Sequence, residues 1–213
     1  MSTSAPAGSE EVVDALCVDG LESLTGPHLL RASDSDRAPH PYLPHRKHHS
    51  IMRVIDAARI RASFINVSVR ERKSLVLPDL SAVAWDRIDY LGWRDPKLPR
   101  VGYVVVIVDD EPVGIMLTQT EASPRSRTQC VWCADVQLPN DVVLFSAKRA
   151  GAAGRRGDTV GTYACAAFEC NANVRRKPRT AYIGFDVEAA RQARIAALGA
   201  NVERFARDVV STA

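Results

Sequence analysis

The pattern of hydrophobic and polar positions along the chain predicts an α+β fold. The clearest segment is Gly102–Val108, a run of β-branched residues typical of a buried strand. The polar residues Asp109–Pro112 predict a turn into a second strand over Val113–Thr120, so the two segments form a hairpin. We therefore expect a small antiparallel sheet with flanking helices. Three further strands are predicted over residues 135–138, 142–149 and 159–164.

Apolar residues recur at helical spacing before and after these strands. A first helix is predicted from Met52 to about Asn66, and Ser68 is a suitable N-cap for a short second helix through Arg72. Asp186 is the predicted cap of a final helix. The apolar side of this final helix, which we assign to core packing, carries Leu198, Val202, Phe205 and Val209.

Two segments are predicted to be loops. Residues 85–96 combine aromatic and acidic side chains with Gly92 and Pro96, which favours a folded loop that covers one side of the domain. Gly151–Gly157 is glycine-rich and basic, and we predict that it is flexible. It lacks the Lys-Ser/Thr ending of a phosphate-binding P-loop.

Residues 1–50 differ from the rest of the chain. They hold five of the twelve prolines and all five histidines, and they show no consistent period. We predict a disordered tail, or an over-extended start that precedes a natural start at Met52. The folded domain is then expected to span residues 51–213.

Four cysteines form the strongest chemical motif. Cys130 and Cys133 are separated by two residues, and Cys165 and Cys170 follow 31 residues later, separated by four. Two close pairs at this separation suit a tetrahedral zinc site. The order of a cysteine knuckle, a hairpin and a helix predicts a C-terminal treble-clef zinc finger over about residues 123–179. Because small zinc fingers fold with their metal, we expect a chelator to unfold this region first.

Other uses of the cysteines stay open from the residues alone, namely buried apolar side chains or two disulfides. No signal peptide is visible, and a cytoplasmic location would keep the thiols reduced and favour zinc. Four cysteine ligands leave no open metal position, and no histidine follows His49, so we expect a protein that is not an enzyme.

Positive charge is concentrated on the cysteine region. The whole chain has a formal charge of +3, but residues 123–179 carry ten basic and four acidic side chains. Such an excess predicts a partner with an acidic protein face, or alternatively RNA or the ribosome. The longest apolar run, Val104–Val108, is far too short to span a membrane.

Several motifs resemble one known family in the right order over about Met52–Val210. They are Arg61–Asn66, Leu77-Pro78, Trp85–Pro96, Gly102-Tyr-Val-Val, Pro112-Val-Gly114, the Cys130 and Cys133 pair, Ala147–Gly151, Gly157–Tyr163, the Cys165 and Cys170 pair, and Val174-Arg175. On these motifs the chain resembles the FusB-type elongation factor G-binding family, in its C-terminal treble-clef zinc-finger domain.

The resemblance implies a non-catalytic zinc protein that binds elongation factor G and contributes to fusidic acid resistance. It also implies that Cys130, Cys133, Cys165 and Cys170 are the zinc ligands. We expect the partner to bind a basic rim that the zinc site brings together, with Phe168 and Tyr163 as aromatic anchors or as core residues. The rim residues are Lys148, Arg149, Arg155, Arg156, Arg175, Arg176 and Lys177.

Overall fold

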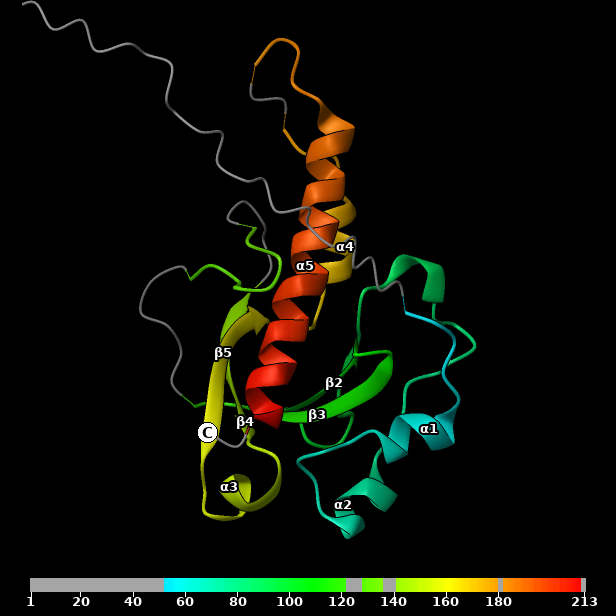
Figure 1. The fold of residues 1–213 in the computed structure, drawn as a ribbon, viewed down its shortest axis with the longest axis vertical. Coiled ribbons are helices and arrows are strands. Elements are labelled where there is room, and N and C mark those ends of the chain that lie inside the picture. The colour runs from blue at the N-terminus through cyan, green and yellow to red at the C-terminus, as the bar shows by residue number, and fades with distance from the viewer. Residues whose placement is uncertain (1–51, 122–127, 136–140, 180–181, 212–213) are drawn as a thin grey trace, which may run out of the picture. The chain divides into compact units, whose positions relative to one another are not determined.

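The computed structural model describes residues 52–121, 128–135, 141–179 and 182–211. The predicted tail, and most of the strand predicted over 135–138, lie outside these ranges. Figure 1 shows the elements. In chain order they are α1 (Ala57–Ala62), α2 (Val69–Ser74), the 3-10 helix η1 (Trp85–Arg87), β1 (Leu91–Arg94), β2 (Val101–Val108), β3 (Glu111–Gln119), β4 (Val142–Lys148), α3 (Gly151–Arg155), β5 (Thr159–Cys165), α4 (Cys170–Arg175) and α5 (Val187–Val210).

The five strands form one antiparallel sheet in the order β1-β2-β3-β4-β5. The predicted hairpin is confirmed as β2 and β3. Its turn consists of Asp109 and Asp110, whose φ angles of 51° and 66° are those of a two-residue turn that matches the strand twist. The predicted α+β class is therefore confirmed.

Strand β2 is buried on both faces, which explains its continuous apolar sequence. Val104 and Val106 point into a core that contains the four cysteines and the apolar side of α5. Tyr103 and Val105 point into a second core, with Ile60 of α1 and other residues near the N-terminal end of the domain. The sheet therefore separates two apolar layers, and the zinc region belongs to the first of them.

The final helix begins where the sequence predicts. The side chain of Asp186 accepts a hydrogen bond from the backbone N–H of Ala189 and caps α5. Its predicted apolar stripe is buried, at Leu198, Val202, Phe205 and Val209. In the part of the chain that the structure describes, no helix combines the length and the apolar character needed to cross a bilayer.

The predicted loop over residues 85–96 is wrong in part, because it contains the edge strand β1. Leu91 pairs with Val105, and Trp93 pairs with Tyr103. Gly92, which suggested a loop, is required by close packing. A Cβ atom there would lie 2.7 Å from the Tyr90 ring and 2.9 Å from the Cβ of Phe168.

Two further segments differ from the predictions. The first helix starts at Ala57 because Asp56 is its cap, whereas Met52 lies before it with its backbone N–H bonded to the carbonyl of Ile88. The predicted glycine loop contains the short helix α3. Its Gly154 packs so closely that a Cβ atom would lie 1.9 Å from the carbonyl oxygen of Arg149.

A buried asparagine holds the sheet together where β3 and β4 separate. These strands pair at Thr118 with Ser146 and at Gln119 with Phe145. Beyond that point the side chain of Asn66 donates to the carbonyls of Met116 and Lys148, at 2.9 and 3.1 Å, and accepts from the N–H of Met116 at 2.9 Å. The Asn66 side-chain amide thus replaces backbone hydrogen bonds that β3 and β4 do not form with each other at this point.

Substitution of Asn66 with Ala should destabilise the domain by about 1–3 kcal/mol, because part-buried backbone groups lose their partners. Chemical denaturation at a fixed zinc concentration would measure this loss. Asn201→Ala is the comparison, since that amide bonds to a single backbone group, the carbonyl of Trp132, and otherwise accepts only from the exposed side chain of Arg204. Asn201→Ala should lower the free energy of unfolding by less than Asn66→Ala does. An equal loss in the two variants would contradict the proposed role of Asn66 in joining β3 to β4.

Candidate metal centre

Four cysteine side chains converge from three parts of the zinc region. Cys130 and Cys133 lie in the turn that precedes β4, Cys165 is the last residue of β5, and Cys170 is the first residue of α4. All four are buried. Since a knuckle, the β4–β5 hairpin and a helix supply the ligands in this order, the predicted treble clef is present.

The sulfur positions fit a metal ion. All four Sγ atoms lie within 4.8 Å of one another. Cys130 and Cys170 are 3.6 Å apart at Sγ, and Cys133 and Cys165 are 3.8 Å apart. Zinc–sulfur bonds of about 2.3 Å in a tetrahedron place the sulfurs roughly 3.8 Å apart, whereas a disulfide needs about 2.05 Å. The geometry therefore matches a four-thiolate zinc site.

The electrostatics of the cluster also call for a cation. Hydrogen bonds from the other thiols lower the pKa of Cys130. The protons that Cys165 and Cys170 share with the Cys130 thiolate raise the pKa of both thiols. Without a metal ion the cluster would therefore retain protons. Zinc displaces these protons and holds all four groups as thiolates.

Aromatic residues enclose the cysteines. The ring of Trp132 lies 5.5 Å from that of Tyr90 and 6.2 Å from that of Phe168, and Phe168 stacks on Phe145 at 5.2 Å. Phe168 is only 5% exposed, and its ring lies against Gly102, where a Cβ atom would be 2.6 Å from it. The structure thus places Phe168, a predicted anchor residue, in the core.

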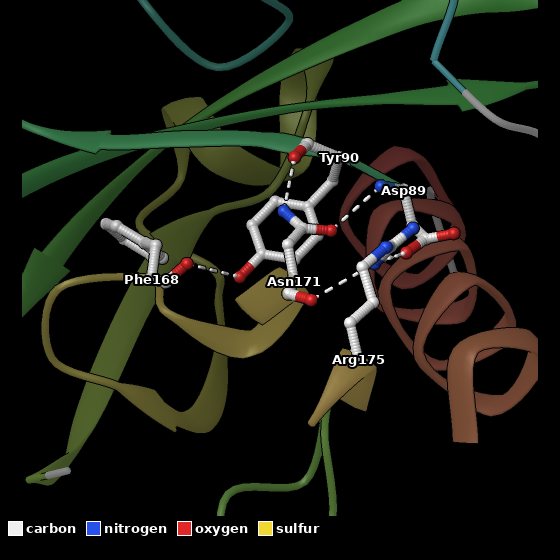
Figure 2. A network of polar contacts seen from close by, with 5 residues as sticks. All are labelled: Asp89, Tyr90, Phe168, Asn171 and Arg175. Carbon is white, nitrogen blue, oxygen red and sulfur yellow. Dashed lines mark hydrogen bonds and ion pairs between the residues drawn. The ribbon is translucent and has the colours of Figure 1, made fainter. Parts of the chain in front are cut away.

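A polar network joins helix α4 to the start of β1, as Figure 2 shows. The side chain of Asn171 accepts from the N–H of Asp89 and donates to the carbonyl of Tyr90, both at 2.8 Å. Arg175 forms an ion pair of 2.7 Å with Asp89, whose side chain is 5% exposed. The Tyr90 hydroxyl donates to the carbonyl of Phe168 at 3.1 Å. The sheet edge and the zinc helix are therefore fixed to each other.

The cations predicted to form one rim lie at two ends of the β4–β5 hairpin. Lys148 pairs with Thr159 at one end, and Val142 pairs with Cys165 at the other. With a rise of about 3.3 Å per residue, these ends are roughly 20 Å apart. Figure 1 shows α3 beyond the first end and α4 beyond the second. The expectation that the zinc site gathers these cations is therefore wrong. One group is Lys148, Arg149, Arg155 and Arg156, and the other is Arg175, Arg176 and Lys177.

Two of these cations have partners in distant parts of the chain, and a third, Arg156, pairs at the exposed surface with Asp158 at 3.5 Å. Arg149 donates to the carbonyls of Asp208 and Ser211 at the end of α5, and Arg175 pairs with Asp89. Both guanidinium groups therefore contribute to the fold. The remaining members are exposed, namely Lys148, Arg155, Arg156, Arg176 and Lys177.

The structure adds exposed apolar residues that the sequence analysis does not select, namely Val131 beside the cysteine site and Tyr182 and Ile183 before α5. Val131, between the first two ligands, is 54% exposed, and its N–H donates to the backbone carbonyl of Tyr163. Residue Tyr163, named in the sequence analysis as an anchor or core residue, is 37% exposed. Tyr182 and Ile183, before α5, are 66% and 103% exposed. The local sequence carried no signal for the exposure of Val131, because Trp132 lies between the same two cysteines and is buried.

A match to a known family agrees with this site. The model of the FBP C-terminal treble-clef zinc-finger family matches residues 59–209. The solved structure of the fusidic acid resistance protein FusC is similar over 57% of this chain, with 24% identity and a TM-score of 0.44. That similarity covers 53% of FusC, so it spans about half of that protein. No sequence among curated proteins matches this chain. The family match includes all four cysteines and confirms the resemblance found in the sequence, so the chain belongs to the FBP C-terminal treble-clef zinc-finger family.

Proposed function

We propose that this protein is a non-catalytic zinc-finger protein that binds elongation factor G in the cytoplasm. The observation that carries the proposal is the family match over residues 59–209, which includes the complete cysteine site. Elongation factor G is the partner implied by the FusB-type resemblance. The name of FusC adds a finer proposal, that binding contributes to fusidic acid resistance.

The metal site supports a structural role for zinc. Four thiolates fill a tetrahedral shell, so no position remains for a water or a substrate. The shell is also buried beneath aromatic residues, including Trp132 and Phe168. Zinc in such a site stabilises the surface that surrounds it and supplies no reacting group.

We assign the binding surface to the end of the β4–β5 hairpin where Val142 pairs with Cys165, next to the cysteine site. Val131 and Tyr163 lie side by side there, joined by a backbone hydrogen bond of 2.9 Å. Exposed aromatic and apolar residues are the usual anchors of protein interfaces. Arg176 and Lys177 are exposed beyond the end of α4, where positive charge would orient an acidic partner.

Titration calorimetry with purified elongation factor G tests this function. Wild-type protein should bind, and the double variant Arg176→Glu, Lys177→Glu should bind about 100-fold more weakly or not at all, because like charges would face each other. Tyr163→Ala should also weaken binding, through loss of an anchor. The control is Arg155→Glu with Arg156→Glu, at the opposite end of the hairpin, which should bind like the wild type. Equal binding by all variants would exclude this surface, and no wild-type binding would exclude the function.

RNA or ribosome binding is the second candidate function, favoured by exposed cations at both ends of the hairpin, such as Lys148 and Lys177. An affinity pulldown with and without RNase separates the two candidates. Elongation factor G should stay bound after RNase treatment, whereas ribosomal components retained through RNA should be lost.

A further inference from the structure

We propose that Asn173 is a positioning residue of the zinc site and donates a side-chain hydrogen bond to the sulfur of Cys165. The Nδ2 atom of Asn173 lies 3.6 Å from the Sγ atom of Cys165. Asn173 is completely buried, at 0% exposure, as an uncharged polar residue among the aromatic and cysteine side chains of the core. This role concerns the metal site and does not depend on the identity of the partner.

Helix α4 aims this amide at the metal cluster. Asn173 follows the ligand Cys170 by three residues, a spacing that places both side chains on the same side of a helix. The backbone is held from two directions. The N–H of Asn173 donates to the carbonyl of Glu169 at 3.0 Å, and its own carbonyl accepts from Arg194 of α5 at 3.2 Å. Arg194 is itself paired with Asp135, which follows the knuckle.

The environment of the side-chain oxygen of Asn173 supports the assignment of this side chain to the contact with sulfur. The Oδ1 atom of Asn173 is buried and has no hydrogen-bond partner among the described residues. A buried polar atom without a partner is costly. Asn171, two residues earlier, uses both its amide atoms to join α4 to β1. The one hydrogen bond that the Asn173 side chain makes among the described residues goes to the Cys165 sulfur, so this bond is what its amide supplies.

The chemistry of the site explains why such a donor is useful. Zinc with four thiolates carries a net charge of −2, and burial makes that charge unfavourable. An N–H group directed at a ligand sulfur stabilises its negative charge and fixes its orientation. Loss of comparable groups around metal ligands typically weakens metal binding by about 10–100-fold.

Asn173→Leu tests this role because it keeps the approximate volume and removes the donor. We expect zinc binding, measured by competition with a chelator, to weaken by about 10–100-fold. Asn171→Leu is the matched control in the same helix. It also removes an amide and weakens folding, and folding is coupled to metal binding. A second measurement must therefore distinguish the two variants.

Cobalt substitution provides that measurement. Loss of an N–H bond raises the energy of the sulfur electrons, so the thiolate-to-cobalt absorption band of Asn173→Leu should shift to longer wavelength. The band of Asn171→Leu should stay at the wild-type position. A wild-type band in Asn173→Leu would overturn the proposal.

Wild-type protein loaded with a magnetic cadmium isotope gives a test that needs no variant. An N–H···S bond transmits scalar coupling from the metal to the amide proton. A correlation between cadmium and the Asn173 side-chain protons is therefore expected. If those protons are visible in the NMR spectrum and show no coupling to cadmium, the proposal is wrong, whether or not the variants fold.

Discussion

Removal of zinc is expected to unfold the whole sheet, and not only residues 123–179 as the cysteine spacing alone suggests. Cys130 and Cys165 belong to the same apolar core as Val104 of β2, Ile115 of β3 and Leu198 of α5. Zinc binding contributes about 10–16 kcal/mol to the folding of small zinc fingers. That is as large as the 5–15 kcal/mol, roughly, that keeps a typical domain folded. Without zinc, four protonated thiols in this core could not supply the same stabilising free energy.

Hydrogen exchange before and after addition of a strong chelator measures this effect. Amide protons of β2 and β3 should lose protection together with those of β4 and β5, and added zinc should restore both groups. A Cys165→Ser variant should show the same global loss without any chelator. Retention of protection in β2 and β3 while β4 and β5 exchange would show that the sheet is stable without its zinc region.

The elements with a local signal could be predicted from the sequence. Strand β2 has a continuous apolar run because both its faces are covered, and the hairpin turn has two aspartates that tolerate positive φ. Helix α5 has a capping aspartate, Asp186, and an apolar stripe at helical spacing. The cysteine spacing likewise indicated the zinc ligands, because the chemistry of zinc restricts both their number and their separation.

The missed elements depend on contacts between distant parts of the chain. Strand β1 is a strand because it pairs with β2, and Gly92 is present because the Phe168 ring occupies the space of a side chain. Phe168 itself has a φ of 60°, which turns its ring inward after Cys165. Nothing in the local sequence distinguishes such a residue from an exposed anchor.

The charges illustrate the same limit most clearly. Arg175 and Arg176 are adjacent in the sequence, and both were expected to face a partner. The structure pairs Arg175 with Asp89, 86 residues away, while Arg176 is exposed. The pairing of Arg175 with an acidic residue so far away in the sequence follows only from the contacts of α4 with the two residues that precede β1.

Substitution of Arg175 with Glu should therefore destabilise the domain by about 3–5 kcal/mol, the usual loss when one member of a buried ion pair is removed. Asp89 is 5% exposed, and a second carboxylate beside it would add repulsion. Arg175 also donates to the carbonyl of Asn171 at 3.1 Å, so helix α4 would lose a further bond. Denaturant unfolding at a fixed free zinc concentration measures the change, since zinc itself shifts the apparent stability.

The neighbouring variant Arg176→Glu is the control with the same change of charge. The Arg176 side chain is exposed, so its stability should stay within about 0.5 kcal/mol of the wild type. Both variants add the same negative charge to the end of α4, and any general electrostatic effect on the helix would appear in both. A difference of several kcal/mol between them therefore reports the contacts that Arg175 makes with Asp89 and with the carbonyl of Asn171. Equal stabilities would mean that the ion pair of Arg175 does not hold the zinc helix to the sheet.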